Sequence, residues 1–358
     1  MARTLRPRSA LIAVAGTGTV LVVGCGVVGT RVARHLADSA RASSVVIDDP
    51  TSLYLDGLVG SSPRVSLLGR RSWEEVAPDV VLLALPTGHV DPATRALRLG
   101  ANVVSVGDAV VDGHGLFALG PMAASLERRV IVGAGYAPGL TCLLARHGAA
   151  DFDEVDEIHV AKIGTAGPAC ARQHHAALSS ESLDWRDGRW ERFVGGSGRE
   201  LRWFPGPIGG VDCYRAALLD PMLLQPVFPE ARRITSRVGA TRRDRATARL
   251  PMLRRPHAEA GDGAVRVEVR GRSAGRVDSI VLGSAARASI GAAAVAAVAV
   301  NEVLAGRFVG PWVGGLAAQV ADPVAMLRAV AALGVGCSKF EGATVGSVEP
   351  RRRTSEAV

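Results

Sequence analysis

The sequence predicts an α/β protein in which a doubly wound parallel sheet is followed by a second domain of the α+β class. Residues 18–148 alternate short apolar runs with helical segments, a pattern typical of parallel βαβ units. Later residues instead show alternating apolar and polar positions, which favour a mixed or antiparallel sheet. The chain has 358 residues, enough for two domains of about 100 to 200 residues each.

The most informative motif opens the first domain. Residues 20–29 read VLVVGCGVVG, an apolar strand that runs directly into a Gly-x-Gly-x-x-Gly turn. In such a turn Gly24 allows the sharp bend, and Gly26 lets the backbone approach a pyrophosphate. Gly29 allows the next helix to pack close to the strand, so that the N–H groups of the helix N-terminus face the anion. The turn, including Val27 and Val28, is therefore predicted to bind a dinucleotide.

The segments after this turn fit the same unit. Residues 30–40 have a helical pattern, and residues 43–49 (SSVVIDD) form a second strand that ends in acid. Asp48 lies 22 residues after Gly26, close to the offset of about 20 for a carboxylate that binds the adenosine ribose. Asp49 takes this role if the strand ends one residue later; alternatively, both acids merely cap a turn. A carboxylate repels a 2′-phosphate, which favours NAD, with NADP as the alternative.

Four more strands and two helices complete the first domain, a Rossmann domain over residues 18–148 preceded by a tail, 1–17. The strands are expected at 65–68, 80–85, 101–106 and 129–132, and the helices at 92–99 and 122–128. Residues 149–288 are expected to form the substrate or catalytic domain, with strands at 157–163 and 264–269. Residues 289–342 form helices that return to the first domain, and residues 343–358 a flexible tail.

Composition excludes several classes of protein. The net charge of +8 comes from arginines spread through the chain, without the interleaved aromatic residues that stack on bases, so we expect no nucleic-acid partner. Five widely separated cysteines show neither metal nor disulfide spacing. The apolar run at 290–304 is shorter than the roughly 20 residues that span a bilayer. We expect a cytoplasmic homodimer that acts on a small molecule, with no membrane or metal partner.

The densest polar segment, residues 162–175, reads KIGTAGPACARQHH. If a helix opens at Ala169, Cys170 and His174 project from the same face, four residues apart. Histidine is the residue best suited to exchange a proton near neutral pH, so His174, and after it His175, is the predicted acid or base. Lys162 and Cys170 are the further catalytic candidates of this segment. The simpler alternative is that one histidine lies on the helix surface and the other only makes a structural hydrogen bond.

Arginines in the second domain are candidate anchors for a substrate carboxylate, which the planar guanidinium binds in bidentate fashion. The candidates are Arg199, in a glycine-rich segment, and Arg242 and Arg243, in a basic segment. A solvated basic face explains the second segment equally well. Residues 184–188 (DWRDG) are better explained as part of a β-hairpin with an Asp-Gly turn.

Three strand ends, VVLLALPTG (80–88), ANVVSVGD (101–108) and GAGYAPGLT (133–141), resemble the saccharopine dehydrogenase-like oxidoreductases. The resemblance covers residues 18–150 and assigns no catalytic residue in the second domain. It implies NAD(P)-dependent hydride transfer on an amino-acid-derived amine or imine, or on a hydroxyl or carbonyl carbon. By position it implies that the adenosine half contacts the glycine turn and Asp48, and that the nicotinamide half contacts Leu85, Pro86, Thr87 and Gly135. The rival interpretation is a non-catalytic dinucleotide sensor or regulatory partner.

Overall fold

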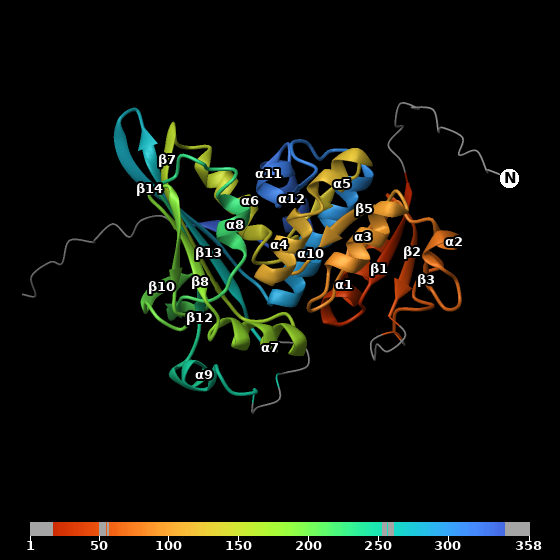
Figure 1. Cartoon of the computed structure of the whole chain (residues 1–358), viewed down its shortest axis with the longest axis horizontal. Helices are drawn as coiled ribbons and strands as arrows, with labels where there is room; N and C mark the ends of the chain where they lie inside the picture. Colours follow the sequence, from red (N-terminus) through yellow and green to blue (C-terminus); the bar gives the residue numbers. More distant parts are fainter. Residues whose placement is uncertain (1–16, 50–54, 56, 253–255, 257–260, 341–358) are drawn as a thin grey trace, which may run out of the picture.

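The computed structural model describes residues 17–49, 55, 57–252, 256 and 261–340. The tails expected at 1–17 and 343–358 lie outside this part of the chain, apart from Thr17. Two sheets form the framework, one toward each end of the long axis of the molecule, and helices fill the space between them (Figure 1). The predicted α/β architecture, with a second sheet domain, is confirmed.

The first sheet has seven strands, all paired in parallel, in the order β15-β6-β5-β4-β1-β2-β3. Its core strands are apolar because helices cover both faces of the sheet. The strands are β1 (Gly18–Val23), β2 (Ala42–Asp48), β3 (Val65–Leu67), β4 (Val80–Leu83), β5 (Asn102–Ser105), β6 (Val130–Ile131) and β15 (Val313–Gly314). Strand β15 comes after the second-sheet strand β14 in the sequence, so a late segment of the chain completes the first sheet.

The helices associated with this sheet include segments far apart in sequence. They are α1 (Val27–Ala37), α2 (Trp73–Val76), α3 (Val90–Arg98), α4 (Val110–Phe117), α5 (Gly120–Ser125), α6 (Leu140–Ala149), α10 (Ala288–Leu304), α11 (Leu316–Gln319) and α12 (Pro323–Ala332). Helix α10 packs against α1 and is buried on almost every side, which its alanine-rich sequence allows. A side chain at Gly291 would collide with the ring of Tyr136, so glycine permits this close packing.

The second sheet is mixed. Strand β7 pairs in parallel with β12 and antiparallel with β13, and the remaining pairs are antiparallel. Its strands are β7 (Glu154–Ile163), β8 (Ser182–Arg186), β9 (Arg189–Phe193), β10 (Glu200–Phe204), β11 (Gly209–Tyr214), β12 (Arg233–Gly239), β13 (Ala264–Ser273), β14 (Arg276–Ala285) and β16 (Ser338–Lys339). Helices α7 (Pro168–Ala177), α8 (Asp220–Leu224) and α9 (Arg242–Thr247) belong to this half.

Strands β8 and β9 form the hairpin that the sequence predicted as the simpler explanation of DWRDG. Asp187 and Gly188 make its two-residue turn, and both have positive φ, 45° and 84°. This backbone matches the type I′ turn that Asp-Gly favours. The segment therefore has a structural role.

Strand β7 carries a lysine on the face that packs against the first domain. Ile158 and Val160 belong to the main apolar core, and Lys162 follows them at the same two-residue period. His159 points to the opposite face, where it bonds to Thr235 and Glu157. The strand thus places one basic side chain at the boundary between the domains. Among the described helices, none is long and apolar enough to cross a membrane.

Candidate active site

A cavity of about 380 Å³ lies between the domains. One side is formed by the glycine turn and by the carboxyl ends of β4 and β5, the edge where doubly wound sheets bind ligands. The other side is formed by the end of β7, the following turn and helix α7. The cavity therefore brings the two sequence segments with the most candidate chemistry into one space.

The three glycines of the turn meet different steric demands. Gly24 has φ +88°, a conformation that glycine adopts easily. A Cβ on Gly29 would lie 2.1 Å from the carbonyl oxygen of Gly24, so helix α1 can approach the turn only with glycine there. Gly26 has an ordinary φ of −72°, and a Cβ there would meet nothing within 4 Å. The open space over Gly26 fits a pyrophosphate, and the adjoining Val27 and Val28 line the same cavity.

The two acids at the end of β2 have different surroundings. Strand β2 ends at Asp48, whose carboxylate accepts a hydrogen bond of 2.7 Å from Trp73 Nε1 and is not among the cavity-lining groups. Asp49, the first residue beyond the strand, lines the cavity and accepts a hydrogen bond of 2.7 Å from the backbone N–H of Cys25. Of the two acids, Asp49 is therefore the one at the cavity, although β2 ends at Asp48 and not one residue later as the alternative drawn from the sequence supposed.

The predicted nicotinamide side is reproduced in part. Leu85, Pro86 and Gly135 line the cavity, whereas Thr87 does not. After Pro86 the chain turns away, and the N–H groups of Gly88 and His89 donate to the carboxylate of Asp112. This turn carries Thr87 away from the cavity.

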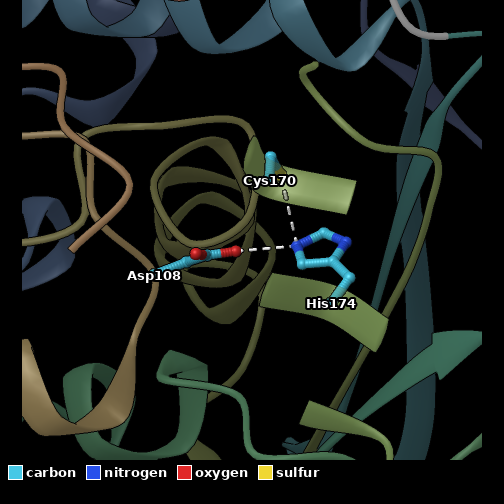
Figure 2. Close-up of side chains that lie close together, drawn as sticks. All are labelled: Asp108, Cys170 and His174. Carbon is cyan, nitrogen blue, oxygen red and sulfur yellow. Dashed lines mark hydrogen bonds and ion pairs between the residues drawn. The ribbon is translucent and has the colours of Figure 1, made fainter. Parts of the chain in front are cut away.

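Three charged side chains meet at the centre of the site. The Lys162 ammonium lies 3.0 Å from Asp108 Oδ2, and it also donates to the carbonyl oxygen of Ala137. His174 Nε2 lies 2.8 Å from the same Asp108 oxygen and 3.0 Å from Lys162 Nζ. Figure 2 shows Asp108 and His174 pointing toward each other from the two sides of the cavity. We call Asp108, Lys162 and His174 the charged triad.

Burial and the neighbouring charges shift the pKa values of the triad residues in opposite directions. Burial disfavours the charged form of His174, but Cys170 and Asp108 outweigh burial and raise the pKa of His174 to about 9. Burial also opposes charge on Lys162, yet the Asp108 carboxylate raises the pKa of Lys162. The pKa of Asp108 is lowered despite burial, because Lys162 and His174 stabilise its anion. The resting triad therefore holds its protons on the two bases.

The Nε2 atom of His174 has one hydrogen-bonding position and three polar neighbours, on Asp108, Lys162 and Cys170. When protonated it donates to Asp108, and when deprotonated it accepts from Lys162. The two states differ by one proton and require no movement of heavy atoms. Such an arrangement can give or take a proton within the cavity.

A metal ion is chemically conceivable here but is not needed. Donor atoms of Asp108, Cys170 and His174 lie within 4.8 Å of one another. The Lys162 ammonium, however, is already 3.0 Å from two of these donors and supplies the positive charge that the carboxylate requires. A divalent ion beside this ammonium would be repelled.

The second histidine has a different environment. His175 Nε2 bonds to the carbonyl oxygens of Thr247 and Leu250, at 2.9 and 3.2 Å, and the residue is buried. It holds α7 against the segment that follows α9, and it is not among the cavity-lining groups. The structural role considered from the sequence thus fits His175, whereas His174 reaches the cavity.

The three expected carboxylate anchors lie elsewhere. Arg199 is exposed and pairs with Asp212 at 2.9 Å. Arg242 and Arg243 belong to α9, a short helix with no buried residue. None of the three lines the cavity, because these segments sit on the outer part of the second domain, as in the solvated-face alternative.

Sequence reasoning missed three polar residues of the cavity: Asp108, Arg172 and Gln173. Asp108 had a usable signal, because it directly follows the apolar strand β5. Arg172 has no hydrogen bond or ion pair with any described residue, and Gln173 has a buried side-chain N–H group without a partner in the same part of the chain. Both are sequence neighbours of Cys170 and His174, which were the stronger candidates by residue type.

Comparison with known proteins supports the fold. No protein-family profile and no curated protein sequence matches this chain. Among solved structures, an amine dehydrogenase from Mycobacterium smegmatis is 12% identical, with a TM-score of 0.50 over 86% of this chain and 98% of that one. GenD2 from gentamicin A biosynthesis, in complex with NAD, is 16% identical, with a TM-score of 0.42 over 94% and 100%.

A third structure is the diaminopimelate (DAP) dehydrogenase of C. glutamicum in complex with DAP. It is 14% identical, with a TM-score of 0.47 over 84% of this chain and 93% of that one. None of these three is a saccharopine dehydrogenase, so the narrower resemblance drawn from the strand ends is not established by them. The likeness to the amine dehydrogenase shows a shared two-domain architecture, and the site must be argued from its own residues.

Proposed function

We propose that this protein is an NAD(P)-dependent oxidoreductase that acts on a carbon bearing an amine or hydroxyl group in an amino-acid-derived substrate. The observation that carries the proposal is the shared cavity: the glycine turn and the charged triad line the same 380 Å³ space. A dinucleotide-binding turn alone predicts only binding, but a proton-exchanging group beside it supports catalysis.

The residues of the first domain provide the cofactor site. Gly24, Gly26 and the N-terminus of α1 would hold the pyrophosphate, and Asp49 would accept from the ribose hydroxyls. Leu85, Pro86 and Gly135 line the part of the cavity that would receive the nicotinamide ring. When bound, the dinucleotide supplies hydride-transfer chemistry.

The charged triad would manage the proton that accompanies this chemistry. His174 gives its Nε2 proton to an amine or alkoxide, or takes one from an ammonium or alcohol. Lys162 donates to Nε2 when that proton has left, and Asp108 keeps both bases oriented. Arg172, which lines the cavity and has no ion-pair partner among the described residues, would bind a substrate carboxylate. The saccharopine dehydrogenase-like class and an amine or imine substrate are the narrower form of this proposal.

The test combines binding and turnover. Purified protein is titrated with NADH and NADPH by fluorescence, then assayed for dinucleotide reduction with amino acids and amines. Lys162→Met and His174→Gln are compared with His114→Gln, whose side chain is exposed on α4 and outside the cavity. The proposal requires turnover that falls in the first two variants only. Tight binding with no turnover on any amine or alcohol would favour the sensor interpretation.

We also propose that the protein forms a homodimer. Leu201 and Trp203 are 60% and 63% exposed on β10, the strand at one edge of the second sheet. Apolar side chains on an edge strand favour pairing with another chain. Light scattering after size exclusion would give the mass in solution, and a monomer at micromolar concentration would contradict the proposal.

A further inference from the structure

Cys170 differs from the other cysteines of the described chain. Cys142 and Cys213 are buried, and burial raises the pKa of each thiol to about 12. Cys25 is also buried, and burial raises its pKa as well. Cys337 is exposed but lies outside the cavity. Cys170 alone among these five lines the cavity and is partly exposed to its interior.

Two basic side chains and the first turn of a helix surround Cys170. Its Sγ lies 3.5 Å from His174 Nε2, which in turn lies 3.0 Å from the Lys162 ammonium. Cys170 is also the third residue of the ten-residue helix α7, where the helix dipole favours negative charge. Neighbouring cations and a helix N-terminus are the environment of reactive cysteines. Figure 2 shows the sulfur and the imidazole projecting together from successive turns of this helix.

Gln173 supplies a donor near this sulfur. It lies three residues after Cys170 on the same helix, so the two side chains are neighbours. The residue lines the cavity, and its Nε2 group is buried and has no hydrogen-bond partner in the described part of the chain. Such a donor can stabilise an oxygen that gains negative charge during attack on a carbonyl group.

We propose that Cys170 is a covalent nucleophile toward carbonyl carbon, so that the cavity accepts an aldehyde as a covalently held substrate. The thiolate sulfur attacks the carbonyl carbon and forms a C–S bond. The electron pair of the C=O π bond moves to oxygen, which receives the Nε2 proton of His174 and a hydrogen bond from Gln173. The product is a neutral hemithioacetal, and Lys162 then donates to the deprotonated imidazole. No oxidant or reductant is consumed.

This inference widens the proposed function from amines and alcohols to aldehydes. It does not depend on dinucleotide binding, because the addition uses only groups of this chain. The two proposals can therefore fail separately: NADH titration tests the first, and thiol chemistry in the absence of cofactor tests the second.

Thiol reactivity is measured first, on the unmodified protein. The full-length chain is treated with iodoacetamide at neutral pH, and peptide mass spectrometry follows alkylation at each cysteine. We expect Cys170 to react at least about tenfold faster than Cys337, because its sulfur lies 3.5 Å from the His174 imidazole at the start of a helix. His174→Gln should remove most of that advantage. Reaction at Cys170 no faster than at Cys337 would overturn the proposal.

Carbonyl addition is measured next, with propanal labelled with ¹³C at the carbonyl carbon. The NMR spectrum should show a hemithioacetal resonance, distinct from free aldehyde and hydrate, with the wild type and with Cys337→Ser. Cys170→Ser should lack it, and Gln173→Leu should weaken propanal affinity up to about tenfold through loss of one hydrogen bond. If the resonance is absent from the wild type, or equal in Cys170→Ser, Cys170 is only a neighbour of His174.

Discussion

Two groups of buried charged residues lie on opposite faces of the second sheet. The charged triad of Asp108, Lys162 and His174 lies on the face toward the first domain. The other group, which we call the sheet network, lies on the outer face and consists of Asp184, Glu200, Arg202, Arg237 and Glu268. Both groups are largely shielded from water, and both combine carboxylates with basic side chains.

The two groups differ in how their hydrogen bonds are completed. In the sheet network, Arg237 donates to both oxygens of Asp184, at 3.0 and 3.1 Å, and none of the network residues lines the cavity. At the triad, His174 Nε2 has three competing partners, on Asp108, Lys162 and Cys170, and faces an open space. A buried charged group therefore indicates catalysis only where it lines a cavity and where its proton can be shared between alternative partners. Elsewhere it stabilises one packing of the chain.

The largest effect is expected for Lys162→Met. Loss of the ammonium removes the group that donates a hydrogen bond to the deprotonated Nε2 of His174, and we expect turnover to fall about a thousandfold. NADH affinity should change little, because Lys162 lies across the cavity from the glycine turn. Steady-state assays and fluorescence titration measure the two quantities. Turnover within a factor of three of the wild type would remove the triad from the mechanism.

The matching change in the sheet network is Arg237→Met. It leaves the fully buried carboxylate of Asp184 without its bidentate partner, so we expect the free energy of unfolding to fall by about 3 to 5 kcal/mol. The folded fraction should keep its turnover. Urea unfolding followed by circular dichroism gives the first value, and an activity assay normalised to folded protein gives the second. A stable but inactive variant would make the network part of the site.

The pH dependence of stability should separate the two groups. The pKa of His174 is raised from 6.5 to about 9, so its contribution is complete below pH 6.5 and disappears as the pH rises through 9, a loss on the order of 3 kcal/mol. Arg266 and Arg270 outweigh burial and lower the pKa of Glu268 to about 2, so its contribution is present above pH 4.5 and disappears as the pH falls. Unfolding free energies measured across this range should decline at both ends.

Two variants test which residue causes each decline in unfolding free energy. His174→Gln should flatten the alkaline side, and Glu268→Gln should flatten the acid side. If His174→Gln leaves the alkaline decline unchanged, the imidazole is not held in its charged form by the triad.

A smaller effect is expected at the acid beside the glycine turn. Asp49→Ser should weaken NADH binding about tenfold, through loss of a charge-assisted hydrogen bond, and should reduce any preference for NADH over NADPH. Asp48→Ser is the control, because the Asp48 carboxylate is engaged by Trp73. Parallel fluorescence titrations with both dinucleotides make the comparison. Equal losses in the two variants would mean that neither carboxylate contacts the ribose.

The sequence predicted the parts of the site that depend on local spacing. The glycine turn, and the Cys170 and His174 pair four residues apart on a helix, follow from fixed backbone geometry. Asp48 and Asp49 were harder to separate, since the end of one strand had to be known to a single residue. The partnership of Asp108 with Lys162 and His174 joins residues 54 and 66 positions apart, across two domains. No local pattern contains that information.

The arginine predictions show the same limit. Arg242 and Arg243 looked like anion anchors because positive charge is dense there, but a helix with no buried face keeps such charge in water. Arg172 was a single charge between two stronger candidates, and only the packing of α7 against the cavity distinguishes it.

The most direct test of the account is NADH binding by Gly26→Ala, with Gly120→Ala as its control. Neither glycine has a positive φ, and a Cβ at either position meets nothing within 4 Å, so both variants should fold with unchanged melting temperature. Only the Gly26 methyl group would enter the space assigned to the pyrophosphate. We predict that Gly26→Ala loses at least about tenfold in NADH affinity, while Gly120→Ala binds as the wild type does. Equal binding by all three proteins would contradict the cofactor site on which the proposed function rests.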